Sequence, residues 1–208
     1  MPALCQDKAP AGPTVSFTLD FPNSEPSHYV IVISHDGPSS YESNGKLTAD
    51  SEVTDPFELR FTASEEIRNR VFDLCKKAKY FRGDIDNKNR NLAFTGKKTL
   101  AYTDGGTHNE ASYNYSPVAA VTELTQVFQS ISTTLEYGRR LQYYHQYQKL
   151  ALDAELKSMD DAMRGGGLQE FQAVAPILRS IISDTTVINV VRSRAQRMLI
   201  LSGGTGQR

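Results

Sequence analysis

The sequence predicts an α+β protein: a small antiparallel sheet of β-hairpins with one packed helix, followed by a long broken helix and a C-terminal helical hairpin. Two observations support this fold class. In the first half of the chain, short apolar or alternating segments are separated by turn sequences that include Asp-Gly, which is typical of β-hairpins. In the second half, apolar residues recur every three or four positions over long stretches, which is typical of helices that bury one face.

The strands are expected on either side of two turns, Asp36-Gly37 and Asp104-Gly105-Gly106. Glycine adopts the positive φ that tight hairpin turns require. The predicted strands are 15–21, 28–34, 39–43, 57–61, 91–94, 98–103 and 111–115, with loops at 44–56 and 82–91. They form two hairpin units around one helix.

That helix is expected over about 64–80. The residues Thr62-Ala63-Ser64-Glu65 have the pattern of a capping box, in which a hydroxyl and a carboxylate each satisfy a free amide at the helix start. Cys75 shares an apolar helical face with Ile67, Val71 and Leu74, so we expect a buried thiol. With Cys5 as the only other cysteine, the chain defines neither a disulfide framework nor a metal site.

A long helix should start at Ser116-Pro117, because serine is a good N-cap and proline suits the first helical position. Its apolar stripe runs to about Glu136 and then changes phase, which predicts a break near Gly138. A second helix is expected over 139–164, ending at three glycines. Two further helices follow, the first kinked or started late by Pro176.

The domain organisation that we expect has four parts. These are a leader or linker at 1–14, a sheet domain at 15–136, a helical unit at 137–201 and a flexible tail at 202–208. The longest uninterrupted apolar run is 29–33, far shorter than the ~20 residues that cross a bilayer, so no membrane span is expected.

The bulk composition is that of a folded globular protein, with 39% hydrophobic and 23% charged residues and a net charge of −1. Acidic residues dominate 36–66 and basic residues dominate 76–98. The basic stretch could be a patch for nucleic acid or an anionic surface. No aromatic platform accompanies it, so a solvated surface is the preferred interpretation and a nucleic-acid partner is not expected.

The N-terminal residues 2–5, Pro-Ala-Leu-Cys, look like the small-residue end of a secretory leader. This favours a periplasmic or secreted protein. An arbitrary N-terminus would leave the cytoplasm as the alternative.

The pattern of elements resembles a family of bacterial exported domains of unknown function. The resemblance covers about 25–136 and rests on the apolar strand, Asp-Gly turn and return strand at 28–43, the capped helix at 61–81 and the hairpin at 98–115. It implies a small sheet-plus-helix module with no established reaction. The C-terminal pair at 168–201 separately resembles one HEAT-like helical repeat.

Several residues could carry chemistry. Ser34-His35-Asp36 contains the residue types of a hydrolase triad, but adjacent residues in an extended chain point to opposite faces and cannot relay a proton. His108 and Glu110 share one strand face and could contribute two metal ligands. A hydrolase or metal-dependent enzyme that uses His35, Asp36, His108 and Glu110 is therefore an alternative, if the two hairpin turns converge.

Other polar groups fit ordinary structure better. Arg192, Arg194 and Arg197 are expected to form a solvated helix face, and His145 and Gln148 to be hydrogen-bonded core residues. The glycine-rich 203–206 lacks the strand and helix that a phosphate-binding loop needs.

The segment 139–164 has two apolar sides, one with Leu141, Leu152, Leu156 and Met159 and the other with Tyr143, Tyr147 and Leu150. Covering both within the chain would place this helix centrally, which is the arrangement that we expect. If only the first side is covered, Tyr143, Tyr147 and Leu150 become an exposed interaction surface.

No motif combines acid, base, nucleophile or metal ligands, so the leading hypothesis is a non-enzymatic binding or interaction module. Its partner would be a protein or a small ligand, and no cofactor is expected. A structural subunit that forms a homodimer through 139–164 is a further alternative.

Overall fold

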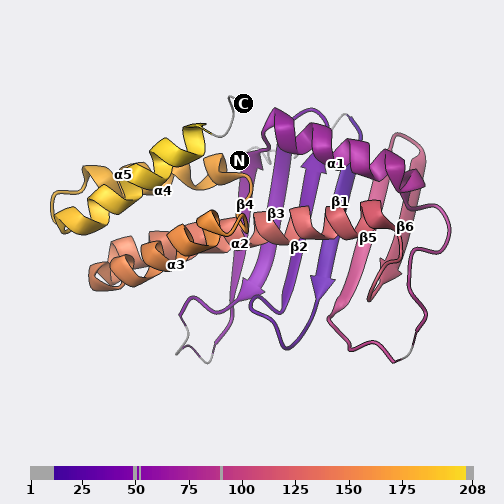
Figure 1. Ribbon diagram of the computed structural model, residues 1–208, viewed down its shortest axis with the longest axis horizontal. Helices are drawn as coiled ribbons and strands as arrows, with labels where there is room; N and C mark the ends of the chain where they lie inside the picture. Colours follow the sequence, from indigo (N-terminus) through magenta and orange to yellow (C-terminus); the bar gives the residue numbers. More distant parts are fainter. Residues whose placement is uncertain (1–11, 49–50, 52, 90, 205–208) are drawn as a thin grey trace, which may run out of the picture. The chain divides into compact units, whose positions relative to one another are not determined.

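The computed structural model describes residues 12–48, 51, 53–89 and 91–204. These residues confirm the α+β class, with a six-stranded sheet, a long helix and a C-terminal helical hairpin. The strand order is β4-β3-β2-β1-β5-β6 (Figure 1). The strands are β1 (Thr14–Asp20), β2 (His28–Ser34), β3 (Pro38–Gly45), β4 (Asp55–Thr62), β5 (Lys97–Asp104) and β6 (Thr107–Tyr113).

The two expected hairpin units are parts of this one sheet. β1 pairs antiparallel with both β2 and β5, so it joins the first hairpin to the second. Both predicted turns are present, between β2 and β3 and between β5 and β6. The predicted return strand at 111–115 starts earlier than expected, because β6 already begins at Thr107.

The chain divides into two compact units, and three elements contribute residues to both. Unit 1 consists of Met1–Glu42 and Glu58–Leu124, and unit 2 of Ser43–Phe57 and Thr125–Arg208. The elements shared between them are β3, β4 and α2 (Ala119–Tyr147). The expected division into a sheet domain at 15–136 and a helical unit at 137–201 stays a prediction.

The core of unit 1 lies between one face of the sheet and α1 (Glu65–Lys77) (Figure 1). Alternate residues of β1 and β2 are buried, as their apolar periodicity predicts. They pack with the buried face of α1, which holds Ile67, Val71, Leu74 and Cys75. The expected buried thiol is confirmed, and burial raises the pKa of Cys75 to about 12.

The capping box predicted at 62–65 is wrong in its register. Ser64 is the N-cap, and its hydroxyl accepts a hydrogen bond from the amide of Ile67. Thr62 belongs to β4, and the third helical residue is an isoleucine, which has no carboxylate to bond back. The helix ends at Lys77, earlier than expected. A 3₁₀ turn follows, η1 (Lys79–Phe81), whose residues all have positive φ.

The strand predicted at 91–94 does not form. The amide of Asn91 bonds to the side chain of Asn89, and the carbonyl of Ala93 accepts from the side chain of Asn114. Phe94 packs edge-on against Phe21. These local side-chain contacts replace a strand ladder, which Asn residues often do.

The long helix α2 starts at Ala119, after Ser116 and Pro117, and runs unbroken through Gly138 to Tyr147. The predicted break at Gly138 is therefore wrong, and the backbone departs from helical geometry at Gln148 instead. The phase change has a different cause: residues 134–139 are all buried, so this part of α2 has no solvent-facing side.

Unit 2 continues with η2 (Lys149–Ala151), α3 (Leu152–Arg164), η3 (Phe171–Val174), α4 (Ala175–Ser183) and α5 (Asn189–Gly204). Pro176 lies in the first turn of α4, which confirms the late helix start. The predicted tail begins too early, because 202–204 still belong to α5, while 205–208 lie outside the described residues. Of the helices in the described part of the chain, none has the length and apolar character needed to span a bilayer.

Candidate interaction surfaces

The two apolar sides expected in 139–164 have different environments. Leu141, Leu152, Leu156 and Met159 are fully buried. On the other side, Tyr147 is 64% exposed and Leu150 is 94% exposed. The expectation that the chain covers both sides is therefore wrong for Tyr147 and Leu150.

The tyrosine patch, defined here as Tyr143, Tyr147 and Leu150, is ordered by contacts among its own rings. The ring centroids of Tyr143 and Tyr147 lie 5.2 Å apart, and Tyr143 also packs against Tyr144 at 5.7 Å. These separations are within the range of favourable aromatic pairs. Leu150 lies on η2, in the turn that follows α2. The rings of Tyr143 and Tyr147 thus pack on each other, and Leu150 is exposed in the turn that follows them.

A polar cluster connects the end of α2 to the end of α4. Asp184 Oδ2 accepts a hydrogen bond from Lys149 Nζ at 2.6 Å and pairs with His145 Nε2 at 3.0 Å. Its Oδ1 accepts from the amide and hydroxyl of Thr186. The expectation that His145 is hydrogen-bonded is confirmed, but the expected core position is wrong, because His145 is half-buried and Gln148 is exposed. The hydrogen bond from Lys149, followed by those from Thr186 and His145, holds the pKa of Asp184 well below its usual range.

This lowered pKa predicts that the cluster loses stability in acid. The carboxylate of Asp184 contributes stability above the pKa of an unfolded Asp, about 4, and the contribution falls as the pH drops towards the lower folded pKa. Asp184→Asn should therefore lower the Tm at pH 7, and the difference from wild type should shrink below pH about 4. Thermal unfolding at several pH values measures this. A difference that does not depend on pH would contradict the role of the charge.

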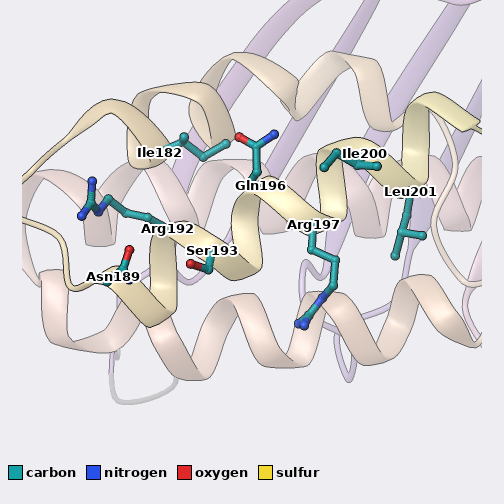
Figure 2. Close-up of a pocket in the computed structure, with 8 residues that line it drawn as sticks. All are labelled: Ile182, Asn189, Arg192, Ser193, Gln196, Arg197, Ile200 and Leu201. Atoms are coloured by element: carbon teal, nitrogen blue, oxygen red, sulfur yellow. The ribbon is translucent and has the colours of Figure 1, made fainter.

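The three arginines of α5 do not form one free basic face. Arg194 Nη1 pairs with Asp153 at 2.6 Å, and Arg197 Nη2 lies 3.5 Å from Asp160, which Arg164 also contacts. Arg192 makes no ion pair in the described part of the chain, and its Nε is buried there without a hydrogen-bond partner. A groove beside α5 contains Arg192 and Arg197 among its lining residues (Figure 2).

The alternative catalytic residues lie as two pairs. His35 and Asp36 lie in the β2–β3 turn, with Nδ1 and Oδ1 3.5 Å apart. His108 and Glu110 lie on the exposed side of β6, with Nε2 and Oε2 3.8 Å apart. Each pair thus has an exposed His next to a carboxylate.

The sheet register separates the two pairs. Ser34, Thr14, Thr103 and His108 are successive partners across four strands. Three strand spacings of about 4.8 Å put His108 roughly 14 Å from Ser34, the residue before His35. Within the described ranges, no group of three or more His, Cys, Asp or Glu side chains could hold a metal ion. The structure therefore does not bring the four residues together.

Among the described residues of the basic stretch 76–98, Lys98 is a buried cation. Its Nζ donates to carbonyl oxygens of Thr95, Gly96 and Asn114 and to the hydroxyl of Thr95. Burial lowers its pKa. Lys98 fixes the start of β5 and is not accessible to a partner, while Lys77 and Lys88 pair with nearby aspartates.

Comparison of the sequence with protein-family models and with curated proteins finds no match to either. The resemblances of 25–136 and 168–201 stay predictions.

The sequence indicated the tyrosine patch but not the other two features. The sequence does not single out Asp184, because its partner Lys149 lies 35 positions away along the chain. The signal that could have indicated the groove is the number of apolar residues in α5. Val190, Ile200 and Leu201 are exposed in addition to the buried Val191, Ala195 and Met198, so α5 has more apolar residues than one packed face can bury.

Proposed function

We propose that this protein is a non-enzymatic interaction module that binds another protein chain through the tyrosine patch. The observation that carries the proposal is the exposure of Tyr147 and Leu150, 64% and 94%, beside Tyr143. Large apolar side chains gathered on a surface are typical of binding sites. Tyrosine is enriched at interfaces because it combines a large apolar ring with a hydroxyl that tolerates water.

The geometry of the patch also favours binding. Tyr143 and Tyr147 already pack against each other, so a partner would order few additional rotamers on this side. Preordered side chains lower the entropic cost of association. Tyrosine is among the residues that contribute most to binding energy at interfaces, and the exposed Leu150 would add apolar contact area.

The enzyme alternative receives less support. His35 with Asp36 and His108 with Glu110 form two exposed pairs, and neither combines a nucleophile, a base and a stabilising group within reach. A location outside the cytoplasm is retained as part of the proposal on the sequence of residues 2–5, which lie outside the described residues.

The proposal predicts that patch substitutions abolish association without unfolding the protein. Tyr147→Ser with Leu150→Ser should change the free energy of unfolding by about 0.5 kcal/mol or less, since both side chains are exposed. The same double variant should lose a partner that wild type retains from an extract of its source cells. Quantitative pull-down and light scattering measure these effects.

A matched control replaces two exposed apolar residues outside the patch, Val53 and Leu92, by serine. This variant should keep the partner. A dimer of wild type that disappears in the patch variant would identify the partner as a second copy of the chain. Equal retention by patch variant and control would contradict the proposal, as would a large loss of stability in the patch variant.

A further inference from the structure

A second surface of unit 2 lies along α5, apart from the tyrosine patch. Its groove is formed by the packed helices α4 and α5, and Ile182 of α4 lies beside Gln196 of α5 (Figure 2). Further along α5, Ile200 is 65% exposed and Leu201 is 48% exposed. The groove is an open hollow of about 460 Å³, and its apolar lining residues are Ile182 of α4 and Ile200 and Leu201 of α5.

The charged residues of α5, which lines this groove, are all basic. Residues 185–204 contain three arginines and no acidic residue. Arg194 and Arg197 are paired with Asp153 and Asp160 of α3. Figure 2 shows the guanidinium groups of Arg192 and Arg197 extending in different directions. Arg192 is therefore the cation that a ligand in the groove can neutralise.

One nitrogen of the Arg192 guanidinium lies inside the fold. Its Nε is shielded from solvent and has no hydrogen-bond partner in the described part of the chain, so a ligand in the groove cannot reach it. A ligand would instead bind the terminal nitrogens Nη1 and Nη2, which are not among the buried atoms. A carboxylate fits best, because it can accept two hydrogen bonds from a guanidinium.

We infer that the α5 groove binds an amphipathic segment of another protein, with apolar residues on Ile182, Ile200 and Leu201 and a carboxylate on Arg192. This is the helix-in-groove mode of recognition, in which an apolar stripe sets the position and a charge sets the specificity. The occupant is a different protein, because the groove has Arg192 and no carboxylate and two copies meeting symmetrically would oppose two arginines.

Other anionic partners fit less well. Segments that recruit anionic lipid gather about four to eight basic residues, whereas this groove offers one unpaired arginine. Nucleic acids require several phosphate contacts and usually aromatic stacking, and no aromatic side chain lines the groove. The mixture of one cation with apolar walls suits a protein segment.

The test uses the full chain and synthetic probes. The probe is a labelled 18-residue helical peptide with a stripe of leucines and flanking glutamates, and its twins carry glutamine or lysine instead of glutamate. Wild type should bind the glutamate peptide at least about tenfold more tightly than the glutamine twin, as measured by fluorescence anisotropy. Arg192→Glu should abolish this preference and favour the lysine twin.

Two controls make the result specific. Arg82→Glu makes the same charge change at an exposed arginine of unit 1 and should leave peptide affinity unchanged. The Tyr147→Ser, Leu150→Ser variant should also bind the peptide normally, so failure of the tyrosine patch and failure of the groove can be distinguished. Ile200→Ser should weaken all three peptides. Circular dichroism confirms that each variant is folded.

Several outcomes would overturn the inference. These are no charge-dependent peptide binding up to about 1 mM, equal loss of binding in Arg82→Glu and Arg192→Glu, or tighter binding to phosphatidylserine vesicles or single-stranded DNA than to the glutamate peptide. Self-association that Arg192→Glu abolishes would assign the groove to a second copy instead.

Discussion

Glu136→Ala is expected to lower the free energy of unfolding by about 3–5 kcal/mol, because it leaves a buried arginine without its counter-charge. Glu136 and Arg139 lie on α2 with side chains that are each 5% exposed, and Glu136 Oε2 is 3.5 Å from Arg139 Nη1. Glu136 Oε1 also accepts a hydrogen bond from Ser43 Oγ at 2.6 Å. The loss should be measured by urea denaturation.

The position of Arg139 explains why the expected loss is large. Its Nη2 donates to the carbonyl oxygen of Asp55 at 2.8 Å, and its guanidinium lies over the ring of Phe57 at 5.1 Å. The pair thus connects α2 to both ends of the segment 43–57 within unit 2. Without Glu136, the arginine stays buried among these groups with its charge unbalanced.

Two further variants separate this effect from simple loss of a side chain. Glu123→Ala removes an exposed partner of Arg70 and should cost less than about 1 kcal/mol. Glu136→Ala combined with Arg139→Met should cost less than the sum of the two single changes, since no unpaired charge remains. Additive losses, or equal losses at Glu123 and Glu136, would show that the buried pair is not coupled as described.

The sequence predicted the parts of the fold that depend on local pattern. Alternation in 28–34 identified a half-buried strand, and the turn at Asp36-Gly37 identified the hairpin that follows it. The face shared by Cys75 and its apolar neighbours was sufficient to predict a buried thiol. In each case, the residues that decide the structure lie within a few positions of one another.

The predictions were wrong where residues distant in the sequence determine the local structure. The segment 91–94 has the composition of a strand, but the side chain of Asn114 binds its backbone. The apolar stripe of α2 changes phase after Glu136, which resembles a helix break. The cause is that segments distant in the sequence cover α2 on more than one side there. Periodicity within one helix cannot distinguish these two causes, since both shift the apolar positions.

The candidate surfaces also depend on both local pattern and residues that are distant in the sequence. The tyrosine patch could be predicted as one of two alternatives, because Tyr143, Tyr147 and Leu150 recur at helical spacing. Which alternative holds depends on what covers them. The groove could not be predicted, because it needs Ile182 of α4 beside α5 and the pairing of Arg194 and Arg197 with α3.

Gly138→Ala is expected to lower the free energy of unfolding by about 1–3 kcal/mol, although the same change usually stabilises a helix interior by roughly 1 kcal/mol. A Cβ atom at position 138 would lie 2.5 Å from Val174 Cγ1 and 3.2 Å from Val174 Cβ. Valine is stiff at χ1 and Val174 is buried, so it cannot turn away without strain. Gly138 thus allows η3 to approach α2, which is a packing role and not a helix break.

The physical cause can be isolated with a second site and a matched glycine. Val174→Ala removes the atom that clashes, so Gly138→Ala should cost much less in that background, with a coupling of about 1 kcal/mol or more in a double-mutant cycle of urea unfolding. Gly203→Ala changes another glycine of a helix, where a Cβ would meet nothing within 4 Å, and it should be neutral or slightly stabilising. If Gly138→Ala stabilised the protein as Gly203→Ala does, α2 and η3 would not pack as closely as the structure shows.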